Sequence, residues 1–251
     1  MSYPPYVIRR SVIQGLAAAA PLAAAWPDAF AQRRKDSVVL GMVLEPPGLD
    51  PTAGAAAAIG EIVHYNVLEG LTKIGMDGAV TPLLAESWTL APDGKACTFT
   101  LKKGVRFSDG AAFDANAVKF SFDRARDPKS TNKAKKALFD NISSVVVHDP
   151  HSLTLVLEKA DASLPFRLGE NTAVILHPNS VASAASKPVG TGPFVVEAWN
   201  KGSAVVLAKS PTFRDAAKVK LAKVTFRFIN DPAAQVAALL AGDIDGMPRF
   251  G

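Results

Sequence analysis

The stretch SVVLGMVLE (37–45) restricts the fold of this chain more than any other feature. Its apolar residues run on almost without a break, which is the pattern of a strand buried on both faces. The next residues, EPPGLDP (45–51), contain three prolines and one glycine, which allow neither a helix nor a strand to continue. We therefore expect a sheet in which this strand is covered on both sides.

Three later segments carry apolar residues at helical spacing together with residues that favour helix ends. Their ends are set by capping side chains, by proline at the first helical position and by glycine just past the last one. The expected helices are one over 57–69 with Gly70 as its C-cap, one that opens at Asp114 and is stopped by Pro128, and one that starts at Asp231-Pro232 and is closed by Gly242.

Short β patterns separated by turn signals fill most of the remaining chain. Asp93-Gly94 and Asn200-Lys201-Gly202 predict the turns of two hairpins, and Asp149-Pro150 separates two further strands. KVTFRFIND (223–231) predicts another strand. Strands and helices are mixed without a repeat, so the expected fold class is α/β or mixed α+β.

The charge and cysteine content exclude several function classes. The net charge of +5 is mild for 251 residues, and the short runs RRK (33–35) and KAKK (133–136) are interpreted as solvated faces, so we expect no nucleic-acid partner. The single cysteine, Cys97, is expected to be a small buried strand residue. Among the four histidines only His148 and His151 are close in sequence, and we interpret both as surface residues. No metal and no cofactor is expected.

The first 31 residues have the order of parts of an export signal. Arg9 and Arg10 precede an apolar run over 12–25 that is shorter than the 20 or so residues needed to span a bilayer. Ala29-Phe30-Ala31 then forms a small-x-small cleavage site before Gln32. The paired arginines resemble a twin-arginine signal, and the general export route stays open as the alternative. We expect a periplasmic protein.

Several landmarks then stand in a familiar order: EPPGLDP, HYNVLEGL, LKKGVRFSDGAAFD, GTGPFVVEAW and ALLAGDIDG. In residue type and spacing they resemble the extracellular solute-binding proteins of peptide and nickel ABC transporters. The resemblance covers nearly all of the mature chain, and LKKGVRFSDGAAFD (101–114) is its most specific piece.

The resemblance implies a fold of two lobes that close on a ligand, the first of which carries an inserted subdomain. On this basis we expect a periplasmic-binding-protein-like lobe over 37–51 and 171–246, an inserted α+β subdomain over 53–170, and a missing second lobe. Members of the family are longer, so we expect this chain to be an amino-terminal portion or a truncated gene. A single lobe offers one wall to a ligand, so the chain alone is expected to bind peptides poorly or not at all.

The same resemblance implies the substrate-binding component of an ABC importer, a monomer that captures short peptides or similar solutes and delivers them to the permease subunits. Nickel chelates, opines and oligosaccharides remain open as ligands. The alternatives are a sensor or chaperone on the same scaffold, or an exported hydrolase that uses Asp243 and Asp245. The motifs G-x-S-x-G, H-E-x-x-H and G-x-x-x-x-G-K-[ST] are all absent from the sequence, and the two aspartates are better interpreted as the polar edge of a strand. We therefore expect that this protein is not an enzyme.

Four residues are expected to contact the ligand: Glu45, Tyr65, Asn66 and Thr191. Glu45 lies at the carboxyl end of the first strand, where open α/β sheets bind ligands, and it can pair with an ammonium group or be an ordinary loop carboxylate. The resemblance places the helix that carries Tyr65 and Asn66 near the cleft, although Asn66 also suits a hydrogen-bonded core residue. Trp88 and Trp199 are interpreted as core packing.

The stretch VGTGPF (189–194) is expected to lead the chain back from the inserted subdomain to the main sheet at the floor of the cleft. Gly190 and Gly192 permit backbone angles and close approaches that a Cβ atom would forbid, and Pro193 ends the irregular stretch. Thr191 lines the cleft in the functional interpretation. In the alternative, which we favour for the glycines, the stretch is a tight structural crossover without ligand contact.

Overall fold

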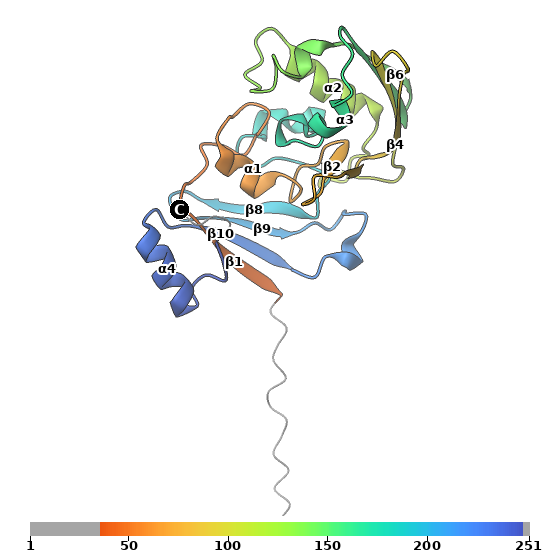
Figure 1. Cartoon of the computed structure of the whole chain (residues 1–251). Coiled ribbons are helices and arrows are strands. Elements are labelled where there is room, and N and C mark those ends of the chain that lie inside the picture. The colour runs from red at the N-terminus through yellow and green to blue at the C-terminus, as the bar shows by residue number, and fades with distance from the viewer. Residues whose placement is uncertain (1–35, 248–251) are drawn as a thin grey trace, which may run out of the picture. The chain divides into compact units, whose positions relative to one another are not determined.

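The computed structural model describes residues 36–247, so the predictions for the export signal over residues 1–31 lie outside the described part. The strands are β1 Ser37–Met42, β2 Thr72–Ile74, β3 Val80–Pro82, β4 Ala85–Leu90, β5 Ala96–Leu101, β6 Ile142–Asp149, β7 Ser152–Leu157, β8 Phe194–Asn200, β9 Ala204–Lys209 and β10 Lys223–Phe228. The α-helices are α1 Ala57–Val63, α2 Ala115–Arg126, α3 Leu164–Arg167 and α4 Pro232–Ala241, with 3₁₀ turns at Phe139–Asn141, Asn171–Ala173, Pro178–Ser183 and Ala216–Lys218. Figure 1 shows their arrangement.

Two helices begin and end where their sequences predict. The Asp114 carboxylate accepts hydrogen bonds from the Asn116 and Ala117 amides at the start of α2, which ends before Pro128. The Asp231 side chain accepts from the Ala234 amide in the same way at the start of α4. These caps satisfy amide groups that have no partner within the helix itself, so they define the first turn locally.

The end of α1 differs from the prediction. The helix stops at Val63, with His64 as its C-cap, and does not reach Glu69 or Gly70. The next residue, Tyr65, has a φ of 60°, which turns the chain out of the helix. The backbone after Tyr65 pairs with another segment instead of continuing the helix, because the Asn66 carbonyl accepts a hydrogen bond from Phe194 at the start of β8. Tertiary contacts therefore override helix propensity here.

The first sheet has the strand order β1-β10-β9-β8, in which β1 runs parallel to β10 and the other pairs are antiparallel. α1 packs against it, and α4 follows the end of β10 (Figure 1). The Asn200–Gly202 turn joins β8 to β9 as predicted. The core on this sheet comprises Met42, Leu49, Ala58, Ile59, Ile62, Val63, Val67, Leu68, Val174, Leu176, Phe194, Val196, Val205, Leu207, Val224 and Phe226.

The prediction that β1 is buried on both faces is wrong for most of its length. Its first four residues are half-buried, and only Gly41 and Met42 are buried. β1 is the outer strand of this four-stranded sheet, and on its far side lies a short stretch of chain that bridges Leu40 to Gly246. An edge position leaves part of an apolar strand open, whatever its sequence pattern.

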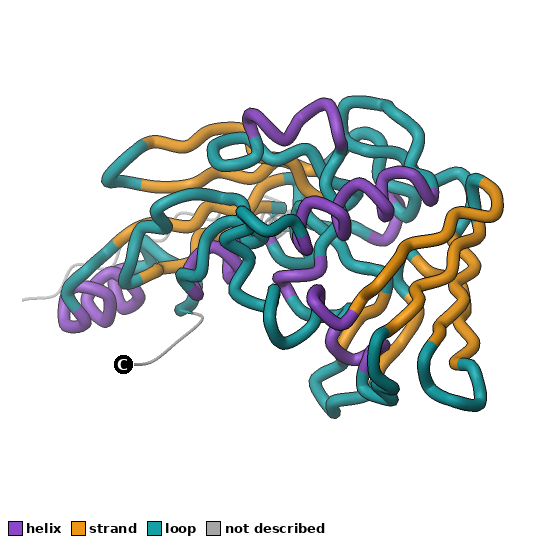
Figure 2. Tube along the Cα trace, turned by 90° about the horizontal axis from the view of Figure 1, so that it is seen from above, coloured by secondary structure: helices purple, strands orange, loops and turns teal. Residues whose placement is uncertain are grey.

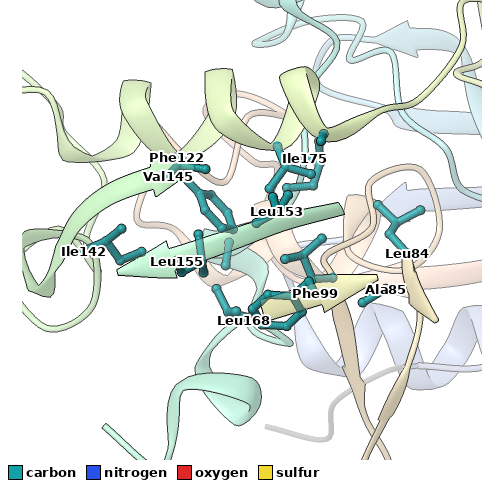
Figure 3. Close-up of a cluster of buried hydrophobic side chains, with 14 of the residues drawn as sticks. Leu84, Ala85, Phe99, Phe122, Ile142, Val145, Leu153, Leu155, Leu168 and Ile175 are labelled. Atoms are coloured by element: carbon teal, nitrogen blue, oxygen red, sulfur yellow. The ribbon is translucent and has the colours of Figure 1, made fainter. Parts of the chain in front are cut away.

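The second sheet has the order β4-β5-β7-β6 and is antiparallel throughout. α2 lies across it, and Phe122 points from the helix toward the strands, where Leu153 and Leu155 are labelled (Figure 3). Cys97 is fully buried in β5, as predicted, and Trp88 packs against the same core. The tube view shows the strands of the two sheets as separate groups joined by loops (Figure 2). β2 and β3 form a small hairpin of their own.

Candidate functional site

A cavity of about 360 Å³ lies at the carboxyl end of β1. Its wall is made by residues 41–45, which end the strand and start the following loop, and by residues 56–58 and 61 at the beginning of α1. Its volume lies near the lower end of the range for small-molecule sites. Of the four residues expected to contact a ligand, only Glu45 lines this cavity.

The Glu45 carboxylate is held in place by the hairpin between β8 and β9. One oxygen accepts a hydrogen bond from the Trp199 indole nitrogen at 2.8 Å, and the other accepts from the Gly202 amide at 2.9 Å. Trp199 is also half-buried against the core of the first sheet, so its predicted packing role is accompanied by a polar one. The side chain of Glu45 is therefore oriented before any ligand arrives.

Tyr65 uses its hydroxyl group inside the protein. The hydroxyl donates to the Gly169 carbonyl at 2.6 Å and accepts from the Ile74 amide at 3.0 Å. Burial raises the pKa of the phenol, and the Ile74 amide opposes that rise. Tyr65 lines a different cavity, of about 320 Å³, together with His64, and the two rings stack at 3.8 Å.

His64 is neutral in this environment. Burial lowers its pKa to about 4, the Gly169 backbone opposes this, and the charge of Lys73 adds to it. A buried imidazole that stays uncharged acts as a packing residue at neutral pH rather than as a cation.

Asn66 and the crossover stretch meet through their backbones. The Asn66 carbonyl accepts from the Phe194 amide at 2.9 Å, and the Val67 carbonyl accepts from the Gly192 amide at 3.0 Å. The Asn66 side chain donates to the Ile62 carbonyl at 2.9 Å. Pro193, between the two donors, supplies no amide hydrogen of its own.

The two glycines of the crossover are required by close approach. A Cβ atom on Gly190 would lie 1.9 Å from the Val67 carbonyl oxygen, and one on Gly192 would lie 2.6 Å from that of Asn66. Neither of these two glycines has a positive φ, so unusual backbone angles are not the reason for glycine here. The contact between two backbones leaves no room for any side chain.

Thr191 belongs to a buried polar group that the sequence interpretation missed. Its hydroxyl donates to Glu69 at 2.7 Å, and Arg214 holds the same carboxylate with two hydrogen bonds of 2.7 and 2.8 Å. Glu69 and Thr191 are 3% and 2% exposed, so the carboxylate depends on these donors for its solvation. Burial alone would lower the pKa of Arg214, but the hydrogen bonds and charge of Glu69 outweigh it, and the pKa is raised.

One signal for this group is present in the sequence. Glu69 is a single carboxylate in the apolar run NVLEGL (66–71), a position where a charge is buried only with a partner. Nothing in the sequence identifies that partner as Arg214, which lies 145 residues away. The cluster of Glu69, Thr191 and Arg214 joins three separate loops at the junction of the two sheets.

The remaining polar candidates do not converge. No group of three or more His, Cys, Asp or Glu side chains that could hold a metal ion occurs in residues 36–247. His148 is exposed near the end of β6, and His151 is half-buried in the turn that leads to β7. The Asp245 carboxylate accepts a hydrogen bond from the Val39 amide of β1 at 2.8 Å. This bond gives Asp245 a structural role. No helix in the described part is long and apolar enough to cross a membrane.

Comparison with known proteins gives consistent matches. The model of the family "Bacterial extracellular solute-binding proteins, family 5 Middle" matches residues 79–250. The glutathione-binding protein GsiB of Salmonella paratyphi A is 32% identical over 199 residues, which are 78% of this chain and 38% of that protein. The probable D,D-dipeptide-binding periplasmic protein DdpA of Escherichia coli K12 is 30% identical over 241 residues, 89% of this chain and 45% of the relative.

A solved structure supports the same fold. The PBP AgaA from A. tumefacien R10, in complex with agropinic acid, superposes with a TM-score of 0.77 at 30% sequence identity. The match covers 83% of this chain and 43% of the other. The expected lobe of periplasmic-binding-protein type is thus confirmed, and the chain spans less than half the length of the proteins it matches.

Proposed function

The chain belongs to family 5 of the bacterial extracellular solute-binding proteins, and from this premise we propose that it serves an ABC importer as the component that captures short peptides or similar small solutes in the periplasm. Its partners are then the ligand and the membrane permease subunits, and it acts as a monomer. The family consists of binding proteins, which fits a role without catalysis. The observation that carries the proposal is the cavity at the carboxyl end of β1, where sheets of this type bind ligands.

Within this proposal, Glu45 is the residue that touches the ligand. Tyr65, Asn66 and Thr191 each donate a side-chain hydrogen bond to another part of the protein, so we assign these three residues to the support of the site. Gly190, Gly192 and Pro193 form a structural crossover in the same assignment. Their role is to bring the start of β8 against the loop that follows α1.

The division into a first lobe (37–51 and 171–246) and an inserted subdomain (53–170) is part of the proposal. Each of the two main sheets has its own hydrophobic core, which supports it. The side chains of α1 pack in the core of the first sheet, so the boundary falls better between Leu68, which belongs to that core, and Leu71, which belongs to the other.

Binding can be tested by NMR on the ¹⁵N-labelled chain with a mixture of di- to pentapeptides. We expect perturbed resonances at 41–45 and 56–61, with affinity weaker than micromolar, because a small cavity with these two wall segments offers few contacts. A screen for peptide and ester hydrolysis on the same sample should show no turnover. Cleavage of the peptides, or perturbations confined to other surfaces, would contradict the proposal. Permease genes beside the coding sequence would favour an importer over a sensor.

A further inference from the structure

The cavity at the end of β1 has an uneven chemical character. Most of its wall is aliphatic: Met42, Val43 and Leu44 come from the strand end, and alanines come from the start of α1. Within residues 36–247, the ionisable side chains of the wall are two glutamates, Glu45 and Glu61. Among the described residues, no lysine, arginine or histidine lines it.

The exposure of these residues suits a binding surface rather than a packing defect. Leu44 is 65% exposed although it is a large apolar residue, whereas Met42, behind it, is 3% exposed. Apolar residues that remain open beside a cavity mark a place where an apolar group of a ligand can be desolvated.

The Glu45 carboxylate has only neutral hydrogen-bond donors within residues 36–247 and has acceptor positions left open. Its two donors, the Trp199 indole and the Gly202 amide, are neutral, so neither cancels the charge. No cationic nitrogen of residues 36–247 forms an ion pair with Glu45; the nearby Lys201 places its ammonium 3.0 Å from the centroid of the Trp199 ring instead. A carboxylate has about four acceptor positions, of which two are used here.

We propose that this cavity takes an aliphatic side chain that ends in an ammonium group, such as that of a lysine residue in a peptide. The stem lies on the aliphatic wall, and the ammonium donates to the open acceptor positions of Glu45. Because the carboxylate is already oriented, little side-chain entropy is lost when the bond forms. An acidic side chain would meet the same carboxylate with no cation paired to it, so it is disfavoured. This inference rests on the proposed solute-binding function and adds a ligand class to it.

The test uses three capped peptides that differ only in the central side chain. Acetyl-Ala-Lys-Ala-amide carries the ammonium, the norleucine analogue keeps a stem without charge, and the glutamate analogue reverses the charge. The ¹⁵N-labelled chain has three tryptophans, so the indole resonance of Trp199 can be assigned with a Trp199→Phe variant and reports directly on the Glu45 carboxylate. We expect the lysine peptide to shift this resonance and to bind about fivefold more tightly than the norleucine peptide, with the glutamate peptide weakest.

Two variants and one control connect the preference to Glu45. Glu45→Gln should reduce the ratio between the lysine and norleucine peptides to about one, because the charge is gone. Ala57→Lys puts a cation into the wall without touching the donors to Glu45, and should invert the ratio. Glu197→Gln, on β8, removes a glutamate that pairs with Lys223 outside the cavity and should leave the ratio unchanged.

The outcomes separate this inference from the proposed function. Equal affinities for the three peptides, or an unchanged ratio in Glu45→Gln and Ala57→Lys, would overturn the ammonium site and leave solute binding intact. If no resonance of the chain moves with any peptide at millimolar concentration, both proposals are wrong for peptides.

Discussion

The two cores of this protein differ in how completely the chain covers them. The core of the second sheet is built from residues 71–175 and includes five fully buried phenylalanines, of which Phe99 and Phe122 are labelled in Figure 3. The first sheet is less completely buried by the rest of the chain. β1 is half-buried over most of its length, and Gln235 is the one residue of α4 that is buried. On that helix Val236 and Leu240 are 47% and 83% exposed.

The two cores also differ in how they are assembled. The second core takes its side chains from one continuous part of the sequence, so neighbouring elements close over each other through short connections. The first core combines residues from 42–68, 174–176 and 194–226, which are far apart in the chain. A core assembled from distant segments has to close long loops before its contacts form, so it depends on each segment being in place.

The largest expected effect tests this contrast directly. Phe122→Ala should lower the free energy of unfolding by about 3–5 kcal/mol, because it leaves a cavity in a closed core. Leu240→Ala on α4 should change it by about 0.5 kcal/mol or less, since the side chain is already open to solvent. Urea denaturation followed by circular dichroism measures both. Similar losses for the two variants would refute the contrast.

The junction between the two regions should be nearly as sensitive. Arg214→Met removes the two hydrogen bonds that Arg214 donates to the buried Glu69 carboxylate and leaves only the one from Thr191, so we expect a loss of about 3 kcal/mol. Arg227→Met is the matched control, because Arg227 is 47% exposed and lies 3.9 Å from Asp243, so its loss should be close to zero. In the double variant Arg214→Met, Glu69→Gln, part of the stability should return. A double variant no better than Arg214→Met would show that the buried charge is not the cause.

The crossover stretch over 189–194 should show the next largest effect on stability. Gly192→Val should cost about 3 kcal/mol, because even its Cβ atom would lie 2.6 Å from a backbone oxygen. Gly246→Ala is the control, since a Cβ atom there has its nearest neighbour at 3.6 Å, an ordinary contact. Thermal melting of both variants gives the comparison. A Gly192→Val curve that overlays that of the parent would mean that the two backbones can move apart freely.

The smallest effect depends on pH. The pKa of His64 is about 4 in the folded protein and 6.5 in the unfolded chain, so between these values the unfolded state binds more protons. The free energy of unfolding is therefore highest above pH 6.5, where His64 is neutral in both states, and it falls as the pH drops toward 4. The total decrease is about 2 kcal/mol, with an allowance for the partial exposure of the ring. His64→Gln should flatten this part of the stability profile, which urea denaturation at a series of pH values measures. Parallel profiles for parent and His64→Gln would rule out the buried neutral imidazole.

Parts of the candidate site were accessible from the sequence and parts were not. Glu45 was predicted at the carboxyl end of β1, because a strand followed by prolines identifies that end locally. Its donors Trp199 and Gly202 lie 154 and 157 residues away, and no local pattern links them to it. The close approach behind Gly190 and Gly192 was among the predicted reasons, but the Asn66–Val67 backbone as the opposing partner was not.

The sequence by itself determined the elements whose causes lie within a few residues. Asp114, Asp231-Pro232 and the Asp93-Gly94 turn act on their immediate neighbours, and α2, α4 and the hairpin of β4 and β5 formed where they predict. Family membership was also predicted from the order of short motifs, which depends only on sequence.

The tertiary structure alone decided the end of α1, the edge position of β1 and the pairing of Glu69 with Arg214. In each case the deciding partner is distant in sequence: the crossover strand takes the backbone after Tyr65, the strand order of the sheet leaves β1 outermost, and a loop before β10 supplies the guanidinium. The local sequence pattern indicates which secondary structure and which degree of burial suit a residue. Which backbone, strand or charge it meets is set when distant segments pack, because burial and hydrogen bonding are satisfied over the whole fold at once.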